Sequence, residues 1–262
     1  MHYYLYDTFL SDKKYEKVID KIKTRLLDLE IQGKHEKLTL LKSLDELVDD
    51  AVTRGATSII VLGNDKIFQK VVNKAAHSGV PIGIIPIGPN NHIAASFGIA
   101  NEEQACDILA ARKIVNFDLG KIQDFYFFTN VKFDKNLSRL TIKKDSYQIS
   151  SGPNVSEVLV YNFYVPKKNP EFDKKMKKYS AQDNRIEIVF NKSQNKKGWF
   201  SGKKKNQKID TIIQSTKFDI KSFEYLPAVI DDYKVLKTPM TVELAKDKLK
   251  VIVGKNRLKN IN

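Results

Sequence analysis

The sequence contains little cysteine and no long hydrophobic run. Cys106 is the only cysteine, so no disulfide can form within the chain, which suits a reducing cytosol. No apolar stretch approaches the roughly 18 residues that a membrane-spanning helix needs. The first residues, MHYYLYDTFLSDKKYEK, become charged too early for a signal peptide. We therefore expect a cytoplasmic protein, and its 262 residues with 42% hydrophobic content suffice for one large domain or two smaller ones.

Acidic residues are scarce in the second half of the chain. Residues 1–118 carry 15 Lys/Arg and 16 Asp/Glu, whereas residues 119–262 carry 30 and 15. This asymmetry indicates an anionic partner, namely lipid headgroups, nucleic acid or phosphates, with lysine enrichment for solubility as the plain alternative. Arginine is scarce in the same half, with only Arg139, Arg185 and Arg257. Nucleic-acid sites usually recruit arginines and several stacking aromatics, so a membrane is favoured over nucleic acid.

Hydrophobic patterning in the first half predicts alternating strands and helices. Short apolar runs such as TSIIVLG are typical of strands buried in a parallel sheet. SLDELVDDAVTRG carries a capping-box pattern, Ser43 with Glu46, and ends at Gly55, a helix-stop signal. The order predicts a three-layer α/β domain with a parallel sheet over residues 1–118. The expected elements are strand 3–8, helix 13–31, helix 43–55, strand 57–63, helix 65–79, strand 80–88, helix 90–98 and helix 101–113.

From about residue 113 the hydrophobic period changes to two, which is typical of strands. We predict an antiparallel β-sandwich-like domain over residues 119–262, with the last strand free to pack back near the boundary. A cleft between the two domains is expected to hold the site. The expected strands are 114–122, 125–133, 137–144, 157–165, 185–191, 209–223, 228–236 and 248–254.

Two turns of small and polar residues lie where predicted strands lead into helices. VLGNDKIF (61–68) passes through Gly63, Asn64 and Asp65, and PIGPNNHIA (86–94) passes through a similar turn. Ligands of parallel α/β sheets bind where strands end and helices begin, and a helix N-terminus attracts phosphate. On spacing alone, however, the asparagines and aspartate are better explained as ordinary helix caps.

The order of these segments resembles the diacylglycerol kinase catalytic-domain family, a group of lipid kinases that shares a fold with NAD kinases. IIVLGNDKIFQKVV corresponds to the family's GGDGT turn, and VPIGIIPIGPNNHIAASFGI to its PLGTGNDFA turn. NFDLGKI, AQDNRIEIVF and PAVIDDYKV follow in the places of the family's DLG, DG-x-L and DGE segments. The resemblance covers nearly the whole chain in order. An NAD kinase fits less well, because its asparagine–glutamate motif has no good match here.

The resemblance implies transfer of a phosphoryl group from ATP, with Mg²⁺, to a lipid hydroxyl. It implies that Asp231 is the general base, and that Asp65 and Asp183 lie near the metal. For "IDDY" the plain alternative is a polar turn between strands. The residues implied in nucleotide binding are Gly63, Asn64, Asp65, Lys66, Gly88, Pro89, Asn90 and Asn91.

Several family positions have changed. Lys66 stands where the family has glycine, so its side chain either crowds the phosphate or binds it as a point charge. Pro89 replaces threonine and lacks an N–H donor. The expected function is therefore a lipid kinase with weakened nucleotide binding, and the alternative is a catalytically silent homologue that binds lipid, nucleotide or a protein partner. Homo-oligomerisation stays open.

A basic segment surrounds the single tryptophan, in KKGWFSGKKK. Residues 191–208 contain seven lysines and no acid. Lysines beside an interfacial Trp and Phe suit an anionic bilayer, whereas burial of the tryptophan in a core is the alternative. We expect peripheral membrane association through Lys196, Lys197, Trp199, Phe200, Lys203, Lys204 and Lys205.

Overall fold

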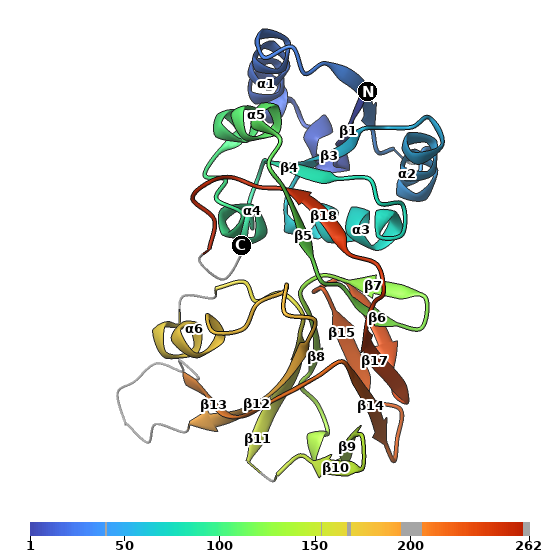
Figure 1. Ribbon diagram of the computed structural model, residues 1–262, viewed down its shortest axis with the longest axis vertical. Helices are drawn as coiled ribbons and strands as arrows, with labels where there is room; N and C mark the ends of the chain where they lie inside the picture. The colour runs from blue at the N-terminus through green and yellow to red at the C-terminus, as the bar shows by residue number, and fades with distance from the viewer. Residues whose placement is uncertain (40, 153, 167–168, 195–205, 259–262) are drawn as a thin grey trace. The chain divides into compact units, whose positions relative to one another are not determined.

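The computed structural model describes residues 1–39, 41–152, 154–166, 169–194 and 206–258, and these divide into two compact units (Figure 1). The first unit runs to Phe117 and resumes at Asp247, and the second comprises Asp118–Lys246. The sequence predicted one boundary after residue 118 and left the last strand free to pack back near it. The structure has a second crossing at Lys246, because the last strand pairs within the first unit's sheet.

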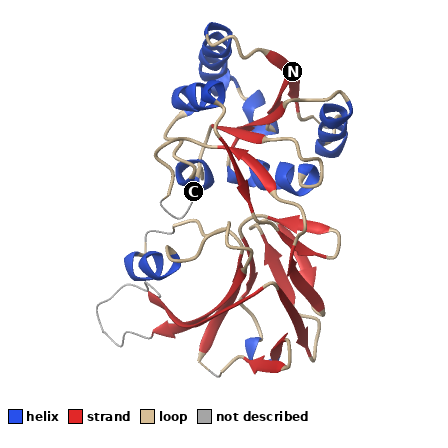
Figure 2. Cartoon of the chain, viewed as in Figure 1, coloured by secondary structure: helices blue, strands red, loops and turns tan. Residues whose placement is uncertain are grey.

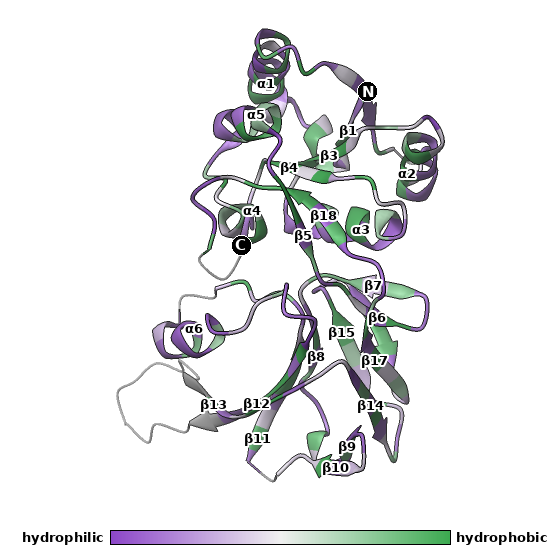
Figure 3. Ribbon diagram, in the orientation of Figure 1, coloured by the Kyte–Doolittle hydropathy of each residue, from purple (hydrophilic) through white to green (hydrophobic). Residues whose placement is uncertain are grey.

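The first unit is built on one six-stranded sheet with the order β2-β1-β3-β4-β18-β5. The pairs from β2 to β18 are parallel, and β5 pairs with β18 in the antiparallel direction. All residues of β3 and β4 are buried, which explains their continuous apolar sequences, and β3 and β18 are green in Figure 3. The strands are β1 (His2–Tyr6), β2 (Gly33–Lys37), β3 (Ser58–Gly63), β4 (Ile82–Pro86), β5 (Ile114–Phe117) and β18 (Leu249–Ile252).

Helices cover both faces of this sheet, as the sequence predicted. Helices α1 and α5 pack together on one face, and α2 and α3 on the other (Figures 1 and 2). The capping box at Ser43 and Glu46 is present, and Gly55 follows its helix with φ 66°. The helices are α1 (Glu16–Asp28), α2 (Leu44–Thr53), α3 (Asp65–Ala75), α4 (His92–Ser96) and α5 (Glu102–Ala111), with 3-10 turns at Thr8–Ser11 and Lys13–Tyr15.

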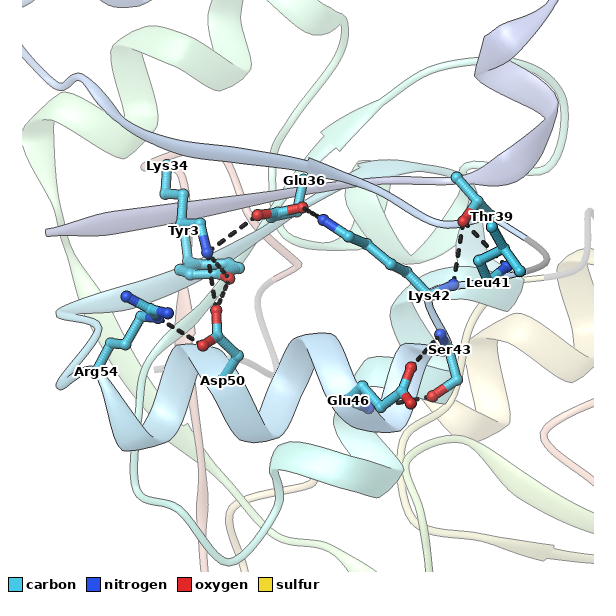
Figure 4. A network of polar contacts seen from close by, with 10 residues as sticks. All are labelled: Tyr3, Lys34, Glu36, Thr39, Leu41, Lys42, Ser43, Glu46, Asp50 and Arg54. Carbon is cyan, nitrogen blue, oxygen red and sulfur yellow. Dashed lines mark hydrogen bonds and ion pairs between the residues drawn. The ribbon is translucent and has the colours of Figure 1, made fainter.

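Edge strand β2 was missed by the sequence reading because its residues, GKHEK, are polar. Its residues Lys34 and Glu36 join a network with β1 and α2 (Figure 4). The Lys34 ammonium lies 2.9 Å from both the Tyr3 hydroxyl and the Asp50 carboxylate. Arg54 also pairs with Asp50. Ionic and hydrogen-bonding contacts thus hold this strand where hydrophobic side chains hold β3 and β4.

The second unit is a pair of antiparallel six-stranded sheets, which confirms the predicted all-β class. Their orders are β10-β9-β14-β17-β6-β7 and β13-β12-β11-β8-β15-β16. One buried cluster takes Phe218 and Val242 from the first sheet, and Val160 and Ile188 from the second, as in a sandwich. The strands are β6 (Gly120–Ile122), β7 (Phe125–Phe127), β8 (Asn130–Phe133), β9 (Leu140–Lys144), β10 (Tyr147–Ser150), β11 (Val155–Tyr161), β12 (Ile186–Gln194), β13 (Asn206–Ser215), β14 (Lys217–Ser222), β15 (Pro227–Ile230), β16 (Lys234–Lys237) and β17 (Met240–Leu244).

Several predicted strands are divided in the structure. Segment 228–236 forms a hairpin, because Asp231 and Asp232 both adopt positive φ between β15 and β16. Segment 209–223 splits into β13 and β14, which lie in different sheets. Strands β10 and β17 were not expected.

Helix α6 (Pro170–Met176) was not expected either. Asn169 caps it, and Phe172 and Met176 cover the second sheet around Tyr161.

Candidate functional site

The first predicted turn lies where the strand connections change direction. Strand β1 is followed in the chain by its neighbour β2, whereas β3 leads away to β4 on the other side. Such a switch point opens a crevice at the carboxyl ends of the strands. Gly63 ends β3 there with φ 152°, and a Cβ on it would lie 2.7 Å from Ile67 and 3.1 Å from the Asp7 side chain. Glycine is therefore required by the chain's own close packing.

Asn64 caps helix α3 directly after this glycine. Its side-chain oxygen accepts hydrogen bonds from the backbone N–H groups of Lys66 (3.1 Å) and Ile67 (3.4 Å). These N–H groups are the ones that a phosphate would contact at the start of α3. The capping interpretation of Asn64 therefore describes the structure correctly.

The second turn packs under the N-terminal segment. Gly88 has φ 81°, and a Cβ there would lie 3.1 Å from the Phe9 ring and 3.6 Å from the Tyr15 hydroxyl. The Phe9 and Tyr15 rings are in edge contact, with centroids 5.3 Å apart. The space that a glycine leaves for a ligand is thus filled by this chain's own aromatic residues.

Asn91 lies on the wall of a cavity beside the second turn. Its amide nitrogen donates to the Gly88 carbonyl at 2.7 Å, while its side-chain oxygen is buried with no hydrogen-bond partner among the described residues. The cavity, of about 340 Å³, is also lined by Tyr15 and Ile99. It adjoins the turn and offers this unpartnered amide oxygen as an acceptor.

Asp65 joins the two turns. Its backbone N–H donates to the Asn90 carbonyl at 3.0 Å. Its carboxylate accepts from the backbone N–H groups of His92 (2.8 Å) and Ile93 (3.0 Å) at the start of α4. The carboxylate therefore provides the negative charge at this helix start, and the turns are fixed relative to each other.

The contacts of Asn64 and Asp65 limit the groups that could bind an anion at these turns. Because side chains cap the first N–H groups of α3 and α4, the backbone donors are already in use. Lys66 is exposed, and no ion pair of its ammonium group is seen in the described part of the chain. The residues present fit a nucleotide phosphate through the Lys66 side chain, and do not fit one through free helix donors.

Asp231 belongs to the second unit and is fully buried. Its carboxylate accepts hydrogen bonds from the N–H groups of Phe128 (2.8 Å), Thr129 (2.7 Å) and Asn130 (3.2 Å). The Thr129 hydroxyl donates a fourth, also at 2.7 Å. Burial raises the pKa of Asp231 to about 6, and these four donors work in the opposite direction. The carboxylate ties the turn after β15 to the start of β8.

A second buried acid, Glu187, lies on β12. Burial raises the pKa of Glu187 to about 8, with Asp183 and Asp118 adding to the rise and a hydrogen bond from Gln214 (2.9 Å) opposing it. Asp183 itself is exposed and accepts from the Arg185 N–H, whereas buried Asp118 accepts from the Asn184 N–H at 2.8 Å. Across the described residues, no group of three or more His, Cys, Asp or Glu side chains could hold a metal ion.

Residues 5–122 match the family model described as "Diacylglycerol kinase catalytic domain". The predicted resemblance to this family is confirmed. A protein named "Diacylglycerol kinase" in Mycobacterium tuberculosis (strain CDC 1551 / Oshkosh), and one of the same name in strain ATCC 25618 / H37Rv, are each 35% identical to this chain over 80 residues. The match covers 30% of this chain and 26% of each relative, so it spans about a quarter of the relatives' length.

The fold extends further than the sequence match. A solved structure of a diacylglycerol kinase from Bacillus anthracis str. Sterne superposes with a TM-score of 0.73 over 97% of both chains, at 16% identity. At this identity the likeness establishes the fold. The diacylglycerol kinase catalytic-domain match contains both turns, and Asp183 and Asp231 lie outside it.

The structure brings some predicted site residues together and leaves others untested. The turns Gly63–Lys66 and Gly88–Asn91 are connected through Asp65 in the first unit, and their role as a binding site stays a prediction. Asp183 and Asp231 lie in the other unit, so a cleft that joins them to the turns stays a prediction. The predicted membrane contacts at residues 196–205 lie outside the described residues.

Sequence reasoning missed Asp7, Phe9 and Tyr15, which pack against the two glycines. Asp7 fell inside the strand expected over residues 3–8, whereas β1 ends at Tyr6 and Asp7 begins the turn. The packing of the Phe9 and Tyr15 rings depends on tertiary structure, so no local sequence signal predicts it.

Proposed function

We propose that this protein is a lipid kinase, which transfers the γ-phosphoryl group of ATP to the hydroxyl of a diacylglycerol-like lipid at an anionic membrane surface. The observation that carries the proposal is the connected pair of turns at the ends of β3 and β4, within the segment that matches the diacylglycerol kinase catalytic domain. The relatives named "Diacylglycerol kinase" support the lipid acceptor.

In this proposal Lys66 provides the phosphate contact at the first turn. Its ammonium group is exposed beside a turn that Asp65 and Asn64 hold in place. A lysine acts here as a point charge, in place of the backbone donors that the capping side chains occupy. We therefore expect weak nucleotide binding.

Mg²⁺ would neutralise charge on the transferring phosphate, and it usually binds through one or two carboxylates together with substrate phosphates. Asp65 and Asp183 are the proposed carboxylates. Both oxygens of Asp65 already accept backbone N–H groups, so this residue fits a metal less well than its family position implies.

Asp231 is the proposed general base. A pKa of about 6 leaves the carboxylate ionised at neutral pH, which is the form that accepts a proton. Because four donors surround the carboxylate, the lipid hydroxyl has to replace one of them to deliver its proton. Asp231 also positions the start of β8, whatever its part in the reaction.

The proposed partner is an anionic membrane surface, and no nucleic acid is involved. Within the described residues, no helix has both the length and the hydropathy to cross a bilayer. The lysine excess of residues 119–262 supports peripheral attachment in the cytoplasm.

A second candidate is a catalytically silent homologue that binds lipid, nucleotide or a protein partner. The saturated, fully buried carboxylate of Asp231 and the capped starts of α3 and α4 favour it. In this candidate the same contacts serve only to stabilise the fold.

A phosphoryl-transfer assay separates the two candidates. We expect the full chain to phosphorylate diacylglycerol, from a panel of hydroxylated lipids in detergent micelles, in the presence of ATP and Mg²⁺. Lys66→Met should weaken ATP binding by about tenfold, because a charged contact is lost. Lys250→Met is the matched control, since the Lys250 amine lies beside Gly79, ahead of β4 and away from the turns.

The variant Lys66→Gly tests the opposite role of the lysine. Tighter ATP binding in this variant would mean that Lys66 obstructs the phosphate. Absence of lipid phosphorylation by the unmodified chain would reject the kinase proposal in favour of the silent homologue, whether or not the chain still binds ATP.

A further inference from the structure

The loop between β14 and β15 exposes two aromatic rings close together. Phe223 is 91% exposed and Tyr225 is 77% exposed. Isolated exposed hydrophobic residues are normal on protein surfaces. Two large exposed rings in one short loop are less usual, and neighbouring exposed apolar side chains often mark a contact surface.

Hydrogen bonds hold this loop in place. The Thr238 hydroxyl accepts from the Leu226 N–H at 2.9 Å, and the Thr238 N–H donates to the Leu226 carbonyl at 3.0 Å. Thr238 also bonds Ser222, so both ends of the loop are attached to one buried residue. The exposure of the rings is therefore built into the loop.

The loop exposes three residues in a row, Phe223, Glu224 and Tyr225, and then turns inward at Leu226. Leu226 is buried in the sandwich core, while Phe223 and Tyr225 point away from it. Between the rings, Glu224 is paired with Arg139 from the 3-10 turn Leu137–Arg139. The loop's one acid is thus neutralised.

Basic residues flank the rings on the adjacent strands. Lys221 precedes the loop on β14, and Lys237 on β16 lies opposite Pro227, the first residue of β15. Both lysines are exposed. The surroundings of the rings are therefore cationic, in a half of the chain that carries 30 Lys/Arg and 15 Asp/Glu.

We propose that Phe223 and Tyr225 form a membrane anchor that inserts at the headgroup level of an anionic bilayer. Aromatic rings settle at the membrane interface, and lysines near it are attracted to anionic headgroups. A second copy of this chain would bring the same positive charge to the contact, which disfavours self-association through this loop. The inference rests on the proposed action at a membrane, and it assigns that contact to residues outside 196–205.

Vesicle binding tests the anchor. The full chain is sedimented with vesicles of phosphatidylcholine containing phosphatidylglycerol, and with vesicles of phosphatidylcholine alone. We expect binding to the anionic vesicles only, and a loss of about tenfold or more in the double variant Phe223→Ser/Tyr225→Ser. Tyr147→Ser is the matched control, because Tyr147 on β10 is 71% exposed and lies outside the loop. It should change binding by less than about twofold.

The outcomes separate the anchor from the kinase proposal. Lipid phosphorylation in detergent micelles needs no docking, so the double variant should keep the activity of the unmodified chain there. Undiminished vesicle binding by the double variant, or no binding by the unmodified chain, would overturn the anchor proposal. The kinase proposal is tested separately by the micelle assay. Loss of a dimer in analytical ultracentrifugation, with vesicle binding unchanged, would assign the loop to self-association and also overturn it.

Discussion

An acid at the sheet edge of the first unit and two buried acids of the second unit are held in opposite ways. In the first unit, Asp50 is partly exposed and bound by the Tyr3 hydroxyl, Lys34 and Arg54, which lower its pKa. In the second unit, Asp231 and Glu187 are buried and bound by uncharged donors, and burial raises their pKa to about 6 and about 8. The difference shows that one chain stabilises acids by opposite charge at a sheet edge, and by amide and hydroxyl donors inside a sandwich.

The contributions of these two kinds of acid to the free energy of unfolding should therefore change with pH in opposite directions. A raised pKa in the folded state favours the protonated form, so this stability is present at acid pH and lost as the pH rises. For Asp231 and Glu187 the loss runs from their ordinary values, 3.8 and 4.5, up to about 6 and about 8. The lowered pKa of Asp50 gives stability above pH 3.8 that is lost as the pH falls below it.

The largest expected effect is that of Asp231→Ala. The substitution leaves three buried N–H groups and one hydroxyl without their acceptor, which should lower the free energy of unfolding by about 5 kcal/mol relative to the control. Urea unfolding at pH 7 measures it. The control is Asp232→Ala, since Asp232 is exposed and has a similar positive φ, so both variants carry the same backbone penalty. Equal losses in the two variants would mean that the buried hydrogen bonds contribute nothing.

An intermediate effect is expected for Glu187→Gln. The variant cannot ionise, so it should gain stability over the unmodified chain by on the order of 4 kcal/mol between pH 5 and pH 9. Unfolding curves across that range, compared with the exposed-site variant Glu171→Gln, give the difference. A gain that is independent of pH would show that Glu187 does not titrate there.

The smallest effect is expected for Asp50→Asn. The variant should be less stable than the unmodified chain at pH 7, and the difference should shrink below pH 3.8 and at high salt, because the network is partly exposed and screened. Hydrogen exchange of the β2 and α2 backbone amides measures this loss of stability locally. The adjacent, exposed Asp49→Asn should leave exchange unchanged. If both variants behave alike, the contrast between the units does not hold.

The parts of the fold that depend on local sequence signals could be predicted from the sequence. The caps at Ser43 and Asn64 and the apolar runs of β3 and β4 act within a few residues, so the α/β layers could be read from them. The polar strand β2 could not be predicted in this way, because Tyr3 and Asp50, the contact partners of its Lys34, are distant in sequence. The surroundings of Asp231 likewise depend on residues 128–130, about a hundred positions away, so neither its burial nor its raised pKa could be seen in "IDDY".

The same limit applies to the candidate site. Gly63, Asp65, Gly88 and Asn91 follow predicted strands, but they were assigned to a site through the family resemblance, because spacing alone favoured ordinary helix caps. That Asp65 bonds to α4, and that Phe9 fills the space above Gly88, follows from how the elements pack.

The position of β18 has a consequence for the order of synthesis. The strand inserts between β4 and β5, yet it follows the whole second unit in the chain. A ribosome therefore releases β1 to β5 long before the strand that completes their sheet, and the free edge of β4 must wait for the last residues made. Phe117 on β5 pairs directly with Leu249 on β18. A tight turn in place of residues 118–248 would therefore join β5 and β18 as a hairpin. A gene shortened in this way would encode the first unit with its sheet complete, whereas a stop codon after residue 118 would leave that sheet without β18.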